Sequence, residues 1–593
     1  MASAAAGSAP AGDDRRPAAT ARARSGRADA AALVSYLALA AVVTRNLWAD
    51  PGGRELFNRD DHGFFLVMIA HGERVLFHGE SPLFTTRLNA PAGVNLMANT
   101  SMPALTIPLA PITHAFGPAV TFAVLLTAGL AGTAAAWWWL LSRQLVGSRP
   151  AAWTGGLWAG FAPGVLAHAN GQVNLVSGYV IPFIAGQVIR LREPGRVWRG
   201  GVLLGLLTVL QAFVNEETLL LAALAMVLIV AGYALMNRPD ARDSAGRFLA
   251  GAAVAAGVAG VLLAYPLYWQ FFGPGHYRGL PFGPDLYATT LGAVVAYSPG
   301  SIAGGTSAVR QFGGSITEAG TFWGPVACLM IVVSAVLARR SAAARATALA
   351  GLILLTMSFG SRLRPSRAGV SIPAPFGWVG RTPVLNLVTT PRYALAATAL
   401  AGVLLALGAD QVRRRPALAH RAFWTGMALA LVPLFPRALP VTPAPAVPAF
   451  FADRMWRPYL RPGQSVVIVP LPAMTTGRDG MRLAALSHLA FRVPRGYFLG
   501  PADPPVHEHG SWRPPPRYAS TLLAGVGRFG FAPYLTAAAR RAVLSDLRYW
   551  RAGVVVLLPG APHRAALWTT LTRVLGLPLP VGGVDVWRLP PSR

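Results

Sequence analysis

The sequence predicts a mainly α-helical, polytopic membrane protein with about 11 transmembrane helices and a small C-terminal α/β domain. Hydrophobic residues make up 53% of the 593 residues and charged residues only 13%, which is far more apolar than a soluble enzyme. Several apolar windows approach the length of about 20 residues that crosses a bilayer, and arginine-rich loops alternate between them. After Pro440 the composition changes, and short β-branched runs replace the apolar windows.

The N-terminal segment, residues 1–29, is rich in Ala, Ser, Gly and Arg and lacks a hydrophobic core. It predicts a disordered cytoplasmic tail and no cleavable signal peptide. The first span follows at residues 30–47, and the transmembrane domain as a whole covers residues 30–440. Because the tail is cytoplasmic, residues 48–117 are predicted to form the first outer loop.

The arginines predict the orientation of the later spans. After a second span at residues 118–141, every second loop carries at least two arginines, as expected of cytoplasmic loops. These loops are "SRQLVGSRP", "RLREPGRVWRG", "NRPDARDSAGR", "ARRSAAARA" and "DQVRRRPALAHR". The segment "MPALTIPLAPITHAFG", residues 102–117, has three prolines and is predicted to be re-entrant or interfacial, because a span there would reverse all five loops.

Residues 441–593 are predicted to form an extracytoplasmic α/β domain. A Pro-rich linker leads into the β-branched runs "SVVIVPLP", "AGVVVLLPG" and "VDVWRLP", which Ala-rich helical stretches separate. The protein is therefore expected in the plasma membrane as a multi-pass protein with a cytoplasmic N-terminus. The net charge of +29 comes from arginines in the loops, so that it indicates topology and a lipid bilayer as partner, and no nucleic acid.

Two adjacent acids, Asp60 and Asp61, begin the first outer loop's apolar stretch "DDHGFFLVMIA". Acids at a membrane boundary are costly and are often functional, although solvated charges paired with nearby arginines are the simpler alternative. The tripeptide "HGE" occurs at residues 71–73 and again at 78–80, seven residues apart, which would place both copies on one helical face. A divalent cation bound there is one alternative, but this short pattern is not specific, and the metal site stays open.

A second acidic pair, Glu216 and Glu217, lies between two apolar runs with almost no loop. This position favours a side chain that faces the bundle or a cavity, and the alternative is a hairpin turn wetted at the headgroups. The preceding outer turn, "AHANGQVNL", offers hydrogen-bonding groups suited to a sugar, or it is an ordinary polar turn. Its candidate side chains are His168, Asn170, Gln172 and Asn174.

The stretch "DDHGFFLVMIAHGERVLFHGESPLFTTRLNAPAGVNLMANTS" resembles the first outer loop of actinobacterial membrane glycosyltransferases of the GT-C superfamily. The segments "GQVNL", "NEETLLL", "TPRYALAA" and "RGYFLGP" resemble that group more loosely, so the resemblance extends over most of the chain. Asp61 stands in the place of the family's aspartate. His62 replaces a proline that is common there, and Ser81 replaces a common asparagine.

The resemblance implies transfer of a sugar from a polyprenyl-phosphate-linked donor to an acceptor at the outer face of the plasma membrane, with inversion. The acceptor is a glycan, a lipid or a protein. A hydroxyl acceptor needs a carboxylate to take its proton, for which Asp61 is the candidate, with Asp60, Glu216 and Glu217 orienting the acceptor. The leaving phosphate needs an arginine, and Arg392 is the first candidate, with Arg381 behind it. A transporter or flippase of lipid-linked sugars and a non-catalytic scaffold remain as alternatives.

Overall fold

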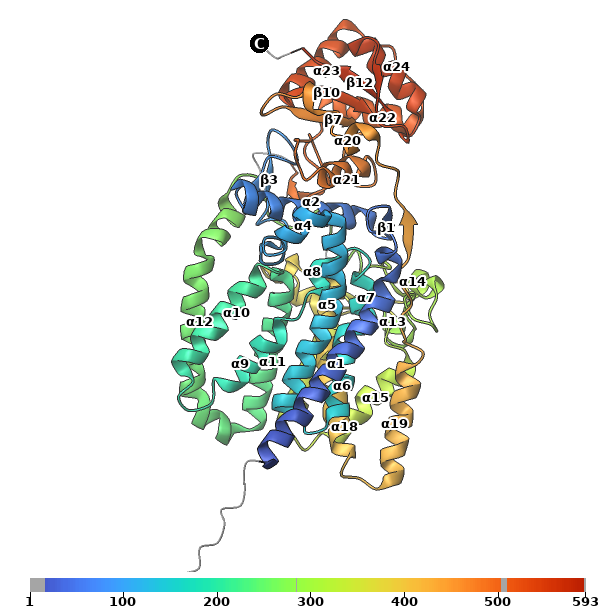
Figure 1. Cartoon of the computed structure of the whole chain (residues 1–593). Helices are drawn as coiled ribbons and strands as arrows, with labels where there is room; N and C mark the ends of the chain where they lie inside the picture. The colour runs from blue at the N-terminus through green and yellow to red at the C-terminus, as the bar shows by residue number, and fades with distance from the viewer. Residues whose placement is uncertain (1–15, 284, 503–508, 591–593) are drawn as a thin grey trace, which may run out of the picture.

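A computed structural model describes residues 16–283, 285–502 and 509–590, with side chains from residue 26 onward. Its larger part is a bundle of helices, and the C-terminal residues form a compact unit above one end of this bundle (Figure 1). The turn between α18 (Tyr393–Val412) and α19 (Ala417–Leu431) and the start of α1 (Arg16–Trp48) lie at the opposite end. The arrangement agrees with a transmembrane bundle whose arginine-rich turns gather on the side away from the C-terminal domain.

The first helix, α1 (Arg16–Trp48), begins well inside the segment predicted to be a disordered tail. The prediction of disorder is therefore wrong for residues 16–29, whereas residues 1–15 lie outside the described residues. The extension is held to the bundle by Asp29, which accepts hydrogen bonds from Trp138 Nε1 at 3.0 Å and from Arg143 Nη2 at 2.5 Å. Trp138 and Arg143 lie 109 and 114 positions away from Asp29 in the sequence. The composition of residues 1–29 therefore does not reveal these contacts.

Six segments of the described chain are long and apolar enough to cross a membrane. The remaining predicted spans coincide with shorter helices, so the number of crossings stays a prediction. The six segments are Gly26–Trp48, Pro118–Leu145, Val173–Arg190, Glu216–Met236, Arg238–Phe272 and Thr390–Val412. The helices that build the rest of the bundle are α6 (Arg149–Phe161), α7 (Pro163–His168), α10 (Val197–Ala212), α15 (Pro325–Leu337), α16 (Ala342–Met357) and α19 (Ala417–Leu431).

Small residues let the central helices approach closely. A Cβ on Gly156 of α6 would lie 2.7 Å from the carbonyl oxygen of Ala134 in α5 (Pro118–Leu140). On the opposite side of α6, Gly402 of α18 (Tyr393–Val412) would place a Cβ 3.0 Å from Gly155 O. Backbone contact through glycine is a common way to pack helices in a membrane, where the hydrophobic effect does not drive helices together. Helices α5, α6 and α18 are therefore closely packed against one another.

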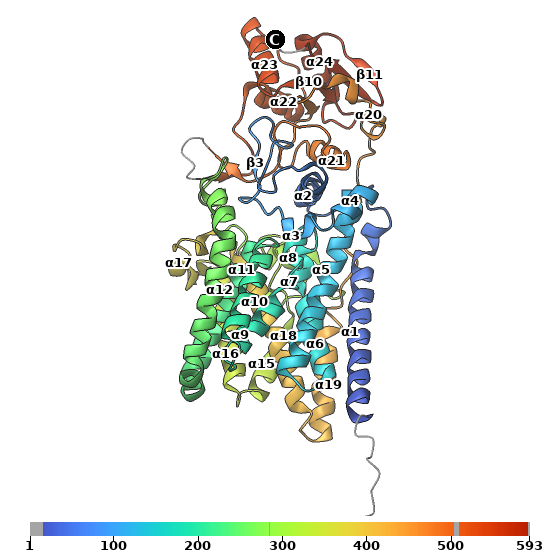
Figure 2. The ribbon, with the colours of Figure 1, turned by 60° about the vertical axis from the view of Figure 1, so that its left-hand side comes forward.

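The predicted first outer loop is a folded structure. Its main element, α2 (Arg59–His78), lies across the end of the bundle between the spans and the C-terminal domain (Figures 1 and 2). A Cβ on Gly72 of α2 would lie 2.5 Å from the carbonyl oxygen of Thr106, which shows how closely α2 rests on the segment below it. That segment forms the short helices α3 (Pro103–Thr106) and α4 (Ala110–Phe116), too short to span a bilayer, as predicted.

The three predicted β-branched runs are strands β7 (Ser465–Val469), β10 (Ala552–Leu557) and β12 (Val584–Arg588). With β11 (Leu579–Val581) they form one sheet in the order β11-β12-β10-β7, in which β10 and β7 are parallel and the other pairs antiparallel. Every residue of β7 and β10 is buried, which explains their continuous apolar sequences. Helices of this part of the chain are α21 (Arg478–Leu486), α22 (Tyr518–Phe529), α23 (Ala537–Tyr549) and α24 (Arg564–Leu575).

Chain segments from residues 441–593 pack around the start of α2 in the first outer loop. In the Pro-rich linker, β6 (Val441–Pro443) pairs antiparallel with β1 (Arg54–Leu56), immediately before α2. Further along, α21 packs against α2 itself. The start of α2 is therefore enclosed by chain from both ends of the sequence.

Candidate active site

A cavity of about 980 Å³ opens where the upper end of the bundle, α2 and the C-terminal domain meet. Its lining combines carboxylates, arginines and amides with the aromatic side chains of Phe64, Tyr497 and Phe498. The structure brings most of the predicted site residues together on its wall. These are Asp60, Asp61, Gln172, Asn174, Glu216, Glu217, Arg381 and Arg392.

Asp61 lies in the first turn of α2 and accepts three hydrogen bonds from neutral side chains. Asn58, the N-cap of α2, accepts from Asp61 N and donates to Asp61 Oδ2 at 2.7 Å. Gln172 Nε2 donates to the same oxygen at 3.0 Å, and the hydroxyl of Tyr497 donates to Oδ1 at 2.8 Å. Burial raises the pKa of Asp61 above its ordinary value, against the hydrogen bonds from Tyr497 and Gln172 that lower it.

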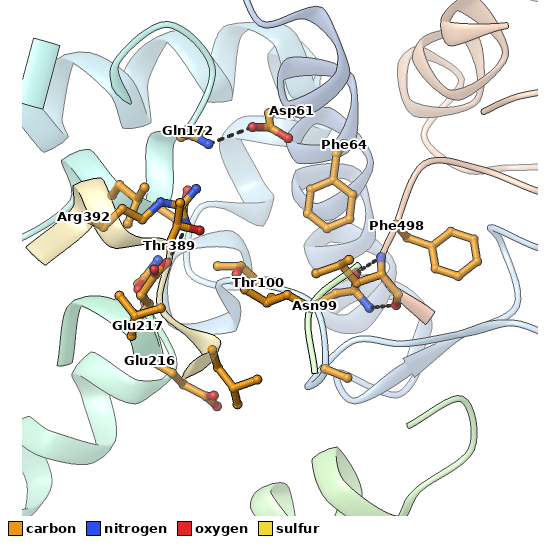
Figure 3. A pocket seen from close by; sticks show the side chains of 18 of the residues that line it. Asp61, Phe64, Asn99, Thr100, Gln172, Glu216, Glu217, Thr389, Arg392 and Phe498 are labelled. Atoms are coloured by element: carbon orange, nitrogen blue, oxygen red, sulfur yellow. Dashed lines mark hydrogen bonds and ion pairs between the residues drawn. The ribbon is translucent and has the colours of Figure 1, made fainter. Parts of the chain in front are cut away.

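The polar turn before the fourth predicted span packs directly on the start of α2. Gly171 has φ +145°, and a Cβ there would lie 2.9 Å from Asn58 O, so the close approach requires glycine. Asn58 N donates to Asn170 O at 3.0 Å and completes this contact. The turn thereby aims Gln172 at Asp61, as Figure 3 shows.

Arg392 binds two carboxylates on the same wall of the cavity. Its Nη1 lies 2.5 Å from Glu217 Oε2, and its Nη2 lies 2.6 Å from Glu318 Oε1, with Nε also donating to Glu318. Figure 3 shows Arg392 and Glu217 side by side, with Glu216 farther along the wall. We call Arg392, Glu217 and Glu318 the Arg392 cluster. Because it contains two acids and one arginine, the guanidinium is already compensated.

A chain of contacts links Asp61 to the Arg392 cluster. His168 Nδ1 is 2.6 Å from Gln172 Oε1, and His168 Nε2 is 3.8 Å from Glu318 Oε2. Burial pushes the pKa of Glu318 up, but the charge of Arg392 outweighs it and holds that pKa below its ordinary value. Glu318 is therefore ionised, whereas Asp61 keeps a higher affinity for protons.

Each remaining acid has a partner of its own. Asp60 pairs with Arg478 of α21, with Nε to Oδ1 at 2.7 Å. It also accepts from Thr475 N at 3.1 Å. Glu216 accepts a hydrogen bond from Gln270 Nε2 at 2.8 Å, near the end of α12 (Arg238–Phe272).

Two predicted sugar-binding residues, His168 and Asn170, do not line the cavity. His168 is buried behind Gln172, and Asn170 donates to the carbonyl oxygens of Leu166 and Ala167. His168 and Asn170 support the turn that carries Gln172. The geometry therefore does not favour the prediction that these two residues contact a substrate. Asn174 does line the cavity, and its Oδ1 is buried without a hydrogen-bond partner among the described residues.

Sequence reasoning missed Glu318 and Tyr497. Glu318 lies a few residues before the apolar helix α15, so the membrane-boundary argument used for Asp61 applies to it as well. Tyr497 carries no local signal, because its role depends on a contact with a residue 436 positions away.

The two "HGE" copies do not share a helical face. Helix α2 ends at His78 with a left-handed C-cap at Gly79, so Glu80 lies beyond it, and that prediction is wrong. Glu80 pairs with Arg74 and Arg87, whereas Glu73 contacts His114 and His488. Across the described ranges, no group of three or more His, Cys, Asp or Glu side chains is arranged to hold a metal ion.

No protein-family model and no curated protein sequence matches the chain. Among solved structures, it is similar to the arabinofuranosyltransferase AftD from Mycobacteria, with 15% identity and a TM-score of 0.55 over 95% of this chain and 40% of that chain. It also matches the oligosaccharyltransferase of Archaeoglobus fulgidus, with 13% identity and a TM-score of 0.48 over 89% of this chain and 67% of that chain. The chain thus spans less than half the length of AftD, and at 15% identity this match shows that the two proteins share a fold.

Proposed function

We propose that the protein transfers a sugar from a polyprenyl-phosphate-linked donor to a hydroxyl acceptor at the outer face of the plasma membrane. The observation that carries this proposal is Asp61, an enclosed carboxylate that faces a large cavity and is held by neutral donors only. A base must be free to accept a proton, and a carboxylate bound by an arginine is a poor one. The glycosyltransferase fold shared with AftD supports the reaction class.

The proposed topology has about 11 spans, a cytoplasmic N-terminus and an extracytoplasmic C-terminal domain. The arginine-rich turns and the C-terminal domain lie at opposite ends of the bundle, which supports this orientation. The cavity then opens at the outer boundary of the membrane. A lipid-linked donor could reach it from the bilayer, and an acceptor from the aqueous side.

In the reaction, Asp61 takes the proton of the acceptor hydroxyl as its oxygen attacks the anomeric carbon. The bond from that carbon to the phosphate oxygen breaks in the same displacement, which inverts the anomeric centre, and the electron pair leaves with the polyprenyl phosphate. The raised proton affinity of Asp61 brings the carboxylate closer to the range of an effective base. Asn58 and Gln172 keep the carboxylate fixed during the attack.

The donor phosphate requires cations that are not already compensated. Arg392, the first candidate from the sequence, is bound by Glu217 and Glu318. Among the described residues that line the cavity, Arg278 and Arg381 are exposed arginines without a carboxylate partner. We assign the phosphate to these two arginines and give Arg392 the role of holding the wall that faces Asp61.

The test is Asp61→Asn in protein reconstituted in nanodiscs, with a polyprenyl-phosphate-linked sugar as donor. The substitution keeps the size and removes the proton acceptor, so turnover should fall by about 10²–10⁴-fold while donor binding is retained. Glu193→Gln, an acid in a predicted cytoplasmic turn, is the matched control and should leave turnover unchanged. An Asp61→Asn protein that turns over like wild type would contradict the proposal and favour a transporter of lipid-linked sugars.

A further inference from the structure

The C-terminal domain forms one wall of the cavity, and one of its side chains reaches the Asp61 carboxylate. We propose that Tyr497 is a positioning residue which holds Asp61 and sets the pH range in which it acts as a base, so that the C-terminal domain completes the active site. This inference rests on the proposed function. It goes further because it gives the C-terminal domain a role in positioning the proposed base.

The two carboxylate oxygens of Asp61 accept hydrogen bonds from two different parts of the chain. Oδ2 accepts from Asn58 and Gln172, which belong to the N-terminal half of the chain. Oδ1 accepts from the hydroxyl of Tyr497 at 2.8 Å, and no other described side chain donates to it. Without the C-terminal domain, one oxygen of the proposed base would have no protein donor.

Tyr497 is fixed from both sides by the first outer loop. Two residues before it, Arg495 O accepts from Asn89 N at 2.9 Å. Two residues after it, Leu499 N donates to Asn99 Oδ1 at 2.8 Å, and Asn99 Nδ2 donates back to Leu499 O at 2.8 Å. The ring of Tyr497 meets Phe64 of α2 edge to face, with centroids 6.3 Å apart.

A glycine makes this close approach possible. Gly496 has φ +151°, and a Cβ there would lie 2.7 Å from Leu88 Cδ1. The segment 495–499 is therefore pressed against the first outer loop, and the aromatic hydroxyl has little freedom to leave Asp61. On the neighbouring residue, the ion pair of Asp60 with Arg478 adds a second tie between α2 and the same domain.

The hydrogen bond stabilises the ionised form of Asp61, because a hydroxyl donates to a carboxylate and gains less from a protonated acid. The other charged and titratable groups that act on Asp61 lie outside the segment 495–499 and are unchanged when the tyrosine hydroxyl is removed. They are the guanidinium of Arg392, the imidazole of His168, the hydroxyl of Tyr287, and the pair Asp60–Arg478. Removing only the Tyr497 hydroxyl must therefore make Asp61 easier to protonate.

The experiment is the pH profile of kcat/KM for Tyr497→Phe in nanodiscs, between about pH 4 and pH 9. Phenylalanine keeps the ring contact with Phe64 and loses one hydrogen bond. The acid limb, on which Asp61 becomes protonated, should move upward by about one pH unit. Tyr534→Phe, which removes a hydroxyl from an exposed tyrosine of the same domain, is the matched control and should leave the limb in place.

A merely structural role for Tyr497 would lower activity or thermal stability without moving the acid limb, and that outcome would overturn the inference. If the acid limb of Tyr497→Phe does not move while the separate variant Asp61→Asn loses activity, only the role of Tyr497 is rejected. Full activity of Asp61→Asn would instead reject the proposed function. A Tyr497→Phe protein with wild-type melting temperature and a shifted limb supports both.

Discussion

Two adjacent acid pairs that line the cavity, Asp60–Asp61 and Glu216–Glu217, show the same division of roles. In each pair one acid is bound by an arginine, Asp60 by Arg478 and Glu217 by Arg392. The other acid of each pair has neutral partners, since Asp61 accepts from amides and a tyrosine and Glu216 accepts from Gln270.

The difference between arginine-bound acids and acids with neutral partners indicates which carboxylates can act on a substrate. An arginine holds a carboxylate in place through charge-assisted hydrogen bonds, so Asp60 and Glu217 tie elements together. Asp60 joins α2 to the C-terminal domain, and Glu217 joins α11 (Glu216–Met236) to the 3-10 turn Thr390–Arg392 that leads into α18. Asp61 and Glu216 stay available to a substrate. The sequence presents both pairs as equivalent neighbours, and only their partners separate them.

The largest effect after that of Asp61→Asn is expected at the arginine that binds two acids. Arg392→Lys keeps the charge but cannot contact Glu217 and Glu318 through three nitrogen atoms, so one buried carboxylate loses its partner. We expect kcat/KM to fall by about 10²-fold, together with a lower melting temperature. Steady-state kinetics and thermal unfolding in nanodiscs measure both.

The matched control for Arg392→Lys is Arg310→Lys, in the exposed helix α14 (Thr306–Phe312) on the same side of the bundle. It should change neither quantity. If Arg392→Lys retains wild-type kcat/KM, the Arg392 cluster does not hold the cavity wall, and the contrast between arginine-bound and free acids loses its functional meaning.

A smaller effect is expected at Glu216, which lines the cavity without an arginine. Glu216→Gln keeps the shape but removes the charge, and a charge-assisted hydrogen bond to an acceptor would be weakened. We expect KM for the acceptor to rise about tenfold with kcat nearly unchanged, measured by varying acceptor at saturating donor. A fall in kcat with unchanged KM would show that Glu216 takes part in the chemical step, and would remove the distinction from Asp61.

The smallest effect is expected at Asp60. Asp60→Asn leaves an oxygen that still accepts from Thr475 N and from Arg478, and this pair is partly exposed. We expect kcat/KM to stay within about threefold of wild type, as is usual for partly solvated ion pairs. Loss of activity comparable to that of Asp61→Asn, in a protein that remains folded, would exchange the roles of the two aspartates.

Local signals in the sequence were enough to predict the membrane class, several long apolar helices and the strands β7, β10 and β12 of the C-terminal sheet. Apolar windows, arginine-rich turns and β-branched runs are local signals, because burial in a bilayer or a sheet acts on each segment separately. The sequence also brought out Asp61, because an acid at the start of an apolar helix is conspicuous within a single stretch of chain.

Only the tertiary structure decided what each charged residue does. Tyr497 meets Asp61 across 436 positions, Arg478 meets Asp60 across 418, and Arg392 meets Glu217 across 175. These contacts determine whether a carboxylate is compensated by a cation or left free to accept a proton. Proton affinity depends on burial and on the charges and donors within a few ångströms, and a linear sequence does not contain those distances until the chain has folded.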